Sequence, residues 1–137
     1  RFSIMANGTI AFDTLSTSGQ ISGTAVSVDT DYLAYGSAKS WLSVTIISNT
    51  HTIQDSLNVG SVTDDGAGRT DLVFTNNMAN DDYSATQSTA TNGDQVFAHF
   101  GAKSLITTSN FRNNTANHEG TILDYEILCA TVHGVLA

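Results

Sequence analysis

Three pairs of acidic residues and four histidines are the side chains of this sequence that could most readily serve catalysis or bind a metal. The pairs are Asp29 and Asp31, Asp64 and Asp65, and Asp81 and Asp82. Each pair stands in a stretch typical of turns, where carboxylates accept hydrogen bonds from backbone amides. Calcium needs many oxygen ligands around one point, and no Asp-x-Asp-x-Asp-Gly loop is present. We therefore predict turn-stabilising roles for these aspartates and no bound calcium.

The histidines and the cysteine also lack the spacing of a metal site. His51, His99, His118 and His133 are far apart in the sequence and form no His-x-x-x-His pattern. The single cysteine, Cys129, lies in the apolar run ILCATV. This position predicts a buried thiol, and a lone cysteine excludes an internal disulfide. No metal site is predicted.

An enzyme is not expected from the remaining acids. A glycoside hydrolase needs two carboxylates that face each other across a cleft. Glu119 and Glu126 are the only glutamates, and most aspartates fall in predicted turns. No Gly-x-Ser-x-Gly elbow, phosphate-binding loop or dinucleotide fingerprint is present. The sequence therefore predicts a protein that is not an enzyme and uses no cofactor.

The charge balance limits the possible partners. Thirteen acidic residues against five basic ones give a formal net charge of −8 at pH 7. Binding to nucleic acid requires a basic face, and the few Lys and Arg residues are scattered along the sequence. No apolar run approaches the length of a transmembrane helix. We expect neither a nucleic-acid partner nor insertion into a membrane.

The elements that position these groups are predicted to be β-strands. Proline is absent, and Ser, Thr and Asn are abundant. Apolar and polar residues alternate with the period of two that is typical of strands in 38–47, on both sides of the DDGAG turn at 64–68, and in 95–100, 104–111 and 121–133. The first arm of the hairpin around this turn is expected to include Leu57 and Val59. In the last strand, the residues predicted to face inwards are Leu123, Tyr125, Ile127, Cys129 and Thr131. Residues 88–94 and 110–120 are predicted to be polar loops, and Tyr32–Gly36 a turn or a single helical turn.

These elements predict a single all-β domain over residues 1–137, an antiparallel β-sandwich or a jelly-roll-like domain. Residues 1–31 are expected to form an extended N-terminal arm, and residues 32–137 the sandwich. Apolar residues on both faces of 39–47 and 95–100 predict a homotrimer. Trp41 and Phe97 are expected in the core.

The turn at 64–68 and its neighbours also carry a resemblance to a known family. The run SVTDDGAGRTDLVFTNNMANDDYSAT, with the upstream GSAKSWLSVT and IQDSLNV, resembles a module of tail-fibre-like virion structural proteins of tailed, particularly marine, bacteriophages. The matching positions are Gly36, Ala38, Lys39, Trp41, Asp55, Ser56, Asn58, Val59, Thr63, Asp64, Gly66, Gly68, Phe74, Thr75, Met78, Ala79 and Tyr83. The match covers residues 28–86 and departs from the family at 42–50.

The resemblance implies a structural protein of the virion. One interpretation is an exposed fibre or receptor-binding module that contacts host surface glycans. The alternative, suggested by the shortness of the chain, is a capsid decoration or capsid-fibre protein whose N-terminal arm is anchored to the shell. In both, the partners are copies of the chain, as a trimer, and other virion proteins.

A binding site for a host glycan is sought in the predicted loop 110–120, because loops carry recognition on rigid scaffolds. Its aromatic ring could stack on a sugar, and its polar groups could bind hydroxyls. The candidate residues are Phe111, Arg112, Asn113, Asn114, Asn117 and His118. The alternative interpretation is that the asparagines only solvate a turn.

Overall fold

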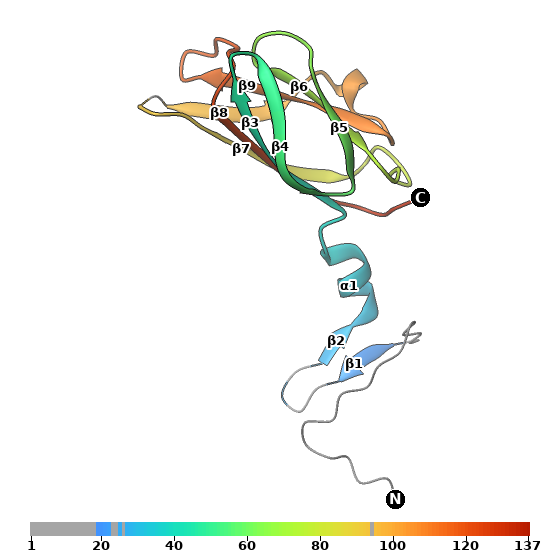
Figure 1. Ribbon diagram of the computed structural model, residues 1–137. Coiled ribbons are helices and arrows are strands. Elements are labelled where there is room, and N and C mark those ends of the chain that lie inside the picture. Colours follow the sequence, from blue (N-terminus) through green and yellow to red (C-terminus); the bar gives the residue numbers. More distant parts are fainter. Residues whose placement is uncertain (1–18, 23–24, 26, 94) are drawn as a thin grey trace, which may run out of the picture.

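The computed structural model describes residues 19–22, 25, 27–93 and 95–137, which fold mostly into antiparallel strands. Two four-stranded sheets carry the strand orders β4-β3-β10-β7 and β5-β6-β9-β8 (Figure 1). We call them the first and the second sheet. The prediction of an all-β antiparallel fold is confirmed.

The strands follow the sequence in an order that keeps several hairpins within one sheet. The first sheet contains β3 (Ser40–Ile47), β4 (Thr50–Leu57), β7 (Ser84–Ala90) and β10 (Ile127–His133). The second sheet contains β5 (Val59–Asp64), β6 (Arg69–Phe74), β8 (Val96–Phe100) and β9 (Asn110–Asn117). The consecutive strands β3-β4, β5-β6 and β8-β9 each pair within one sheet and not across the two sheets. We therefore describe the fold as a sandwich of two sheets.

The two sheets enclose one hydrophobic core. Leu42, Val44 and Ile46 on β3 are buried and alternate with half-buried neighbours, as the sequence predicts for this strand. They belong to the same cluster as Leu72 and Phe111 of the second sheet, so the inner faces of both sheets pack together.

The hairpin around the DDGAG turn is confirmed as β5 and β6. Gly66 and Gly68 adopt positive φ angles of 102° and 65°, and the Gly66 amide donates a hydrogen bond to Asp64 Oδ1 at 2.8 Å. The sequence had placed Leu57 on the first arm of this hairpin, which is wrong. Leu57 ends β4, and Asn58, at a φ of 55°, turns the chain from the first sheet into the second.

Two segments between β6 and β9 differ from the sequence prediction. The predicted loop 88–94 begins too early, because β7 continues to Ala90 and pairs with β10. Ser and Thr suit a strand with one solvated face as well as they suit a loop. Of the predicted strand 104–111, only Asn110 and Phe111 are in a strand, at the start of β9. The residues before them form a 3-10 turn (Lys103–Leu105) and a bend, which Thr107 fixes by accepting a hydrogen bond from the Asn110 amide at 3.1 Å.

The last strand is shorter than predicted and faces the other way. β10 covers only Ile127–His133, and Leu128, Ala130 and Val132 face the core. The predicted inner set is therefore wrong within β10, although Tyr125, which precedes the strand, is buried as predicted. Pairing with β3 sets the register, because Leu128 lies opposite the buried Val44.

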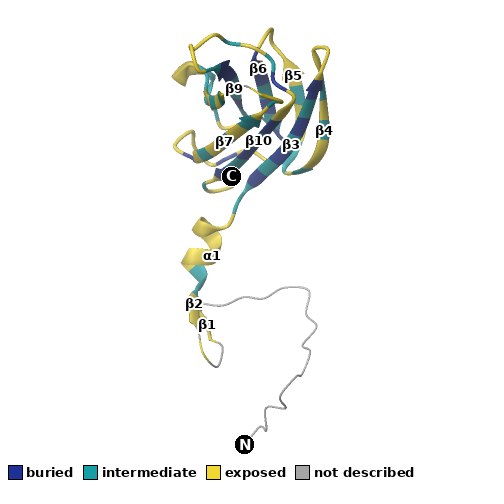
Figure 2. Ribbon diagram, turned by 90° about the vertical axis from the view of Figure 1, so that its left-hand side faces the viewer, coloured by how far each residue is buried: buried dark blue, intermediate teal, exposed yellow. Residues whose placement is uncertain are grey.

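The chain before the sandwich forms a separate projection, which we call the stalk. It consists of β1 (Gln20–Ser22), β2 (Ser27–Asp29) and α1 (Thr30–Gly36), which lie outside both sheets (Figures 1 and 2). The predicted single helical turn at Tyr32–Gly36 is confirmed as part of α1, whose N-cap Asp29 accepts a hydrogen bond from the Asp31 amide at 2.9 Å. Residues 1–18 of the predicted arm lie outside the described residues.

Candidate functional site

All of the predicted glycan-binding residues except His118 lie on β9, a central strand of the second sheet, and not in an exposed loop. Phe111 is fully buried, with its ring centroid 5.4 Å from that of Phe100, so it has no face for a sugar. Asn113 is 2% exposed, Asn114 and Asn117 are half-buried, and only His118, beyond the strand, is exposed. The loop prediction is wrong because polar Asn113 and Thr115 occupy inward positions, which hides the alternation of the strand.

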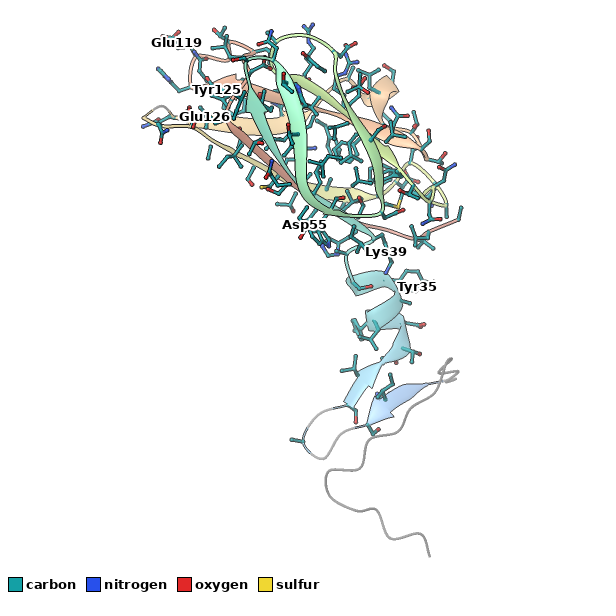
Figure 3. The ribbon with its side chains drawn as sticks, in the orientation of Figure 1. Tyr35, Lys39, Asp55, Glu119, Tyr125 and Glu126 are labelled. Atoms are coloured by element: carbon teal, nitrogen blue, oxygen red, sulfur yellow. The ribbon has the colours of Figure 1, made fainter. Side chains whose placement is uncertain are left out.

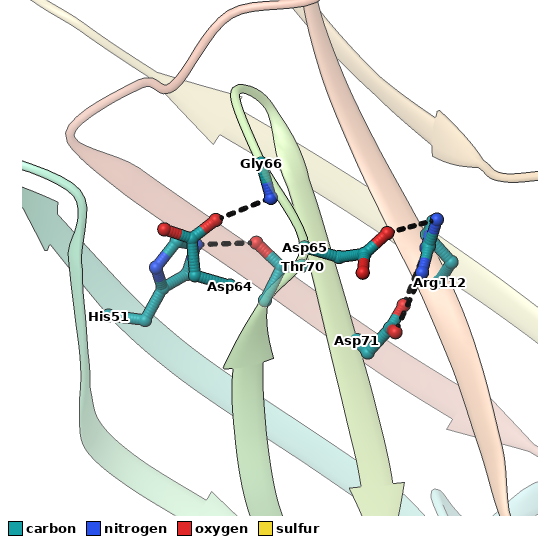
Figure 4. A network of polar contacts seen from close by, with 7 residues as sticks. All are labelled: His51, Asp64, Asp65, Gly66, Thr70, Asp71 and Arg112. Atoms are coloured by element: carbon teal, nitrogen blue, oxygen red, sulfur yellow. Dashed lines mark hydrogen bonds and ion pairs between the residues drawn. The ribbon is translucent and has the colours of Figure 1, made fainter.

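Arg112 points to the outer face of the second sheet and is held by two carboxylates. Its Nε and Nη2 atoms lie 2.6 and 2.8 Å from the Oδ1 and Oδ2 atoms of Asp71, and Nη1 lies 2.6 Å from Asp65 Oδ2 (Figure 4). Hydrogen bonding to Asp71 raises the pKa of the Arg112 guanidinium. Arg112 therefore joins β9, β6 and the β5-β6 turn, and its donors are used within the fold.

A polar group also lies inside the sandwich, next to this turn. His51 Nε2 lies 2.9 Å from Thr70 Oγ1 (Figure 4). Thr70 is the cross-strand neighbour of Asn113. Neither side-chain amide atom of Asn113 has a hydrogen-bond partner among the described residues. These side chains make one end of the core polar, which costs stability wherever a buried donor stays unpaired.

The segment between β9 and β10 is fixed to the same turn. The Gly68 amide donates to Asp124 Oδ1 at 2.5 Å, and Thr115 Oγ1 donates to the Leu123 carbonyl at 2.6 Å. A Cβ atom on Gly68 would lie 2.6 Å from the Leu123 amide, so only glycine permits this approach. These contacts position residues 121–126 at the end of the sandwich that lies away from the stalk, which we call the tip (Figure 3).

A shallow hollow of about 550 Å³ opens at the tip. Ile47 and Ile127 are 69% and 42% exposed there, and Glu126 accepts a hydrogen bond from Asn92 Nδ2 at 3.3 Å. The described residues that line it are Thr45, Ile46, Ile47, Ser48, Glu126 and Ile127. Aliphatic side chains beside hydroxyl groups and a carboxylate can bind a partly apolar, hydroxyl-rich ligand.

Sequence reasoning missed this hollow, although one signal for it was present. Ser48 and Asn49 connect β3 to β4 with φ angles of 50° and 63°, as in a tight two-residue hairpin turn. Serine and asparagine between two strands indicate such a turn, and the turn leaves Ile47 exposed at its edge.

Several acidic residues predicted in turns do serve backbone amides or an arginine. Asp29 caps α1, Asp64 binds the Gly66 amide, and Asp65 binds Arg112. In the third acidic pair, Asp81 and Asp82, it is the backbone amide of Asp82 that donates a hydrogen bond, to Asn80 Oδ1 at 3.1 Å. Within the described ranges, no group of three or more His, Cys, Asp or Glu side chains is arranged to hold a metal ion.

Neither helix in the described part of the chain has the length and apolar character needed to cross a membrane. Comparison of the chain with known protein families, curated proteins and solved structures gives no match in any of the three.

Proposed function

We propose that the chain is a non-enzymatic structural protein of a bacteriophage virion, part of a homotrimeric fibre or receptor-binding appendage that contacts the host surface. The observation that carries this proposal is the separation of two surfaces along the molecule (Figure 3). The stalk exposes Tyr32, Leu33 and Tyr35 at one end, and the hollow beside Ile47 opens at the other. Such a polarity suits a module that attaches at one end and binds at the other.

The resemblance of residues 28–86 to tail-fibre-like virion proteins supports the same context. The residues of that resemblance are used structurally here. Gly66 and Gly68 have positive φ angles, Asn58 turns the chain between the sheets, and Tyr83 packs edge-on against Phe74 at 5.6 Å. These residues maintain the sandwich, whereas the residues of the tip determine which ligand is bound.

The tip hollow is the proposed contact with host glycans. Sugar rings present both hydroxyl groups and apolar faces, which match the hydroxyls of Thr45 and Ser48 and the side chains of Ile47 and Ile127. A single shallow site of this kind binds weakly, so several copies in one appendage would supply the avidity.

Substitution of Ile47 tests this contact. The variant Ile47→Asp should reduce attachment of the purified protein to host cells at least tenfold, because it places a charge on the apolar wall of the hollow. Phe97→Asp is the matched control, since Phe97 is also an exposed apolar residue, at 44%, but does not line the hollow. Equal attachment of both folded variants would remove the hollow as the host-binding site.

The alternative function is capsid decoration, in which the N-terminal arm anchors the protein to the shell. The exposed apolar residues of the stalk favour this possibility, because they could equally be buried against other virion proteins. Labelled images of intact virions distinguish the two functions. Label on the tail supports the appendage, label on the capsid supports decoration, and label on neither contradicts both.

A further inference from the structure

Exposed apolar side chains gather at the end of the molecule where the stalk joins the sandwich. Eight of the twelve large hydrophobic residues exposed in the described part of the chain lie on the stalk or beside its junction. They are Ile21, Val28, Tyr32, Leu33, Tyr35, Leu57, Val135 and Leu136. We call them the stalk–base surface. Such a concentration marks an interaction site, because single exposed apolar residues are normally scattered.

No other described part of the same chain covers the stalk. The helix α1 has no buried residue, and Tyr32 is 78% exposed. The stalk touches the sandwich by polar contacts at its junction, where the Gly36 carbonyl lies 3.1 Å from His133 Nδ1. A seven-residue helix and a hairpin with three residues in each strand are too short to be stable alone in water. Packing of their apolar side chains against a further surface would therefore stabilise them.

The surface continues onto the sandwich as a hollow of about 390 Å³. Leu57 and Leu136 line it together with Lys39, directly above the C-terminal end of α1. Tyr35 lies at nearly this level (Figure 3). When two copies stand side by side in the same direction, the Tyr35 ring of one copy is at the right height to pack beside the hollow of the next.

The charges at this level are complementary to each other. Lys39 and Asp55 both lie at the junction (Figure 3), and neither forms an ion pair with a described residue. With a net charge of −8, two copies repel over most of their surfaces. The stalk adds two acids, Asp29 and Asp31, of which Asp29 caps α1. A mainly apolar surface with one cation and one anion at its junction favours a second copy of this chain over an acidic or basic partner.

We infer that the stalk–base surface binds further copies of the same chain, side by side and parallel, with Lys39 of one copy facing Asp55 of the next. This inference locates the subunit contact of the proposed trimer and rests on the proposed function only for the number of copies. It differs from the sequence-based expectation that the outer faces of strands make this contact.

Charge reversal in two separate preparations tests the contact. Lys39→Glu places two acids at each junction, and Asp55→Lys places two bases there. The concentration at which half of the protein is dissociated should therefore be about tenfold higher for each variant alone than for the unaltered protein. A mixture of the two variants restores opposite charges between unlike copies. Sedimentation of the mixture should therefore show mixed oligomers at concentrations where each variant alone is monomeric.

The apolar part is tested by replacing Tyr32, Leu33 and Tyr35 together with Ser. The full-length variant should be monomeric, whereas the control Phe97→Ser should have the same oligomeric mass as the unaltered protein. Circular dichroism verifies that both remain folded. A monomeric unaltered protein, or an oligomer that survives both sets of substitutions, would overturn the inference. Virion labelling is independent of this result, so an error in the subunit contact is distinguishable from an error in the proposed function.

Discussion

The phenol of Tyr83 connects the aromatic core to the backbone of a neighbouring turn. Its hydroxyl donates to the carbonyl oxygens of Thr107 and Asn110, at 3.1 and 3.2 Å. Burial raises the pKa of Tyr83 from 10.0 to about 12. The folded protein therefore holds this proton more tightly than the unfolded chain does.

This pKa shift predicts a loss of stability in alkali. Below pH 10 the tyrosine is protonated in both states, and its full contribution is present. Between pH 10 and about 12 the unfolded chain ionises first, so the free energy of unfolding should fall by up to about 2.5 kcal/mol. Urea denaturation at several pH values measures the change. Tyr83→Phe should lack this decrease, and an equally steep decrease in that variant would exclude Tyr83 as its cause.

Asn113 is predicted to destabilise the fold that contains it. Its buried amide atoms lack partners among the described residues, so Asn113→Leu should raise the free energy of unfolding by about 1 kcal/mol. The control is Thr115→Val on the same strand, which removes the hydrogen bond to the Leu123 carbonyl and should lower it by about 1 kcal/mol. Urea midpoints measure both, and destabilisation by Asn113→Leu would indicate that its amide is satisfied.

At the scale of the elements, the two glycines of the β5-β6 turn should differ strongly. Gly66→Ala adds a methyl group in open space and should cost about 1 kcal/mol through its positive φ. Gly68→Ala also forces Cβ to within 2.6 Å of the Thr115 carbonyl oxygen and should cost more than about 3 kcal/mol. Thermal melting compares the variants, and equal losses would show that residues 121–126 do not pack closely on this turn.

The sequence was sufficient to predict the fold where apolar residues are buried and polar residues are exposed. In β3 every second residue from Leu42 to Ile46 is apolar and buried, and in the β5-β6 hairpin the glycines stand where positive φ is needed. It was insufficient in β9, where Asn113 and Thr115 face inwards. Phe97, expected in the core, is 44% exposed on an edge strand, because apolar residues occupy both faces of β8.

The candidate site was harder to predict than the fold. The hollow at the tip combines the β3-β4 turn with Glu126, which precedes β10. Their proximity depends on the pairing of β3 with β10, a contact between distant parts of the sequence. Neither segment has the composition of a polar recognition loop, because one wall of the hollow is aliphatic.

At the scale of the whole molecule, the sandwich should fold without the stalk. Among the described residues, none of those buried in the core lies before Ser40. A chain that begins at Ser37 should therefore unfold cooperatively, with a free energy within about 1 kcal/mol of that of the monomeric full-length protein. Urea denaturation provides the comparison. Loss of cooperative unfolding in the shortened chain would show that the stalk is part of the folding unit.

The position of β10 in the first sheet has a consequence for biosynthesis. This last strand lies between β3 and β7, and Val132 pairs with Ser40 at the opposite end of the sandwich sequence. During translation the stalk and β3 leave the ribosome long before β10 exists, so Leu42, Val44 and Ile46 remain without their partner strand. If the stalks bind one another as inferred above, those of neighbouring nascent chains on one messenger RNA would meet before any of their sandwiches is complete. Assembly would then begin on the polysome, before the final residues of each chain are released.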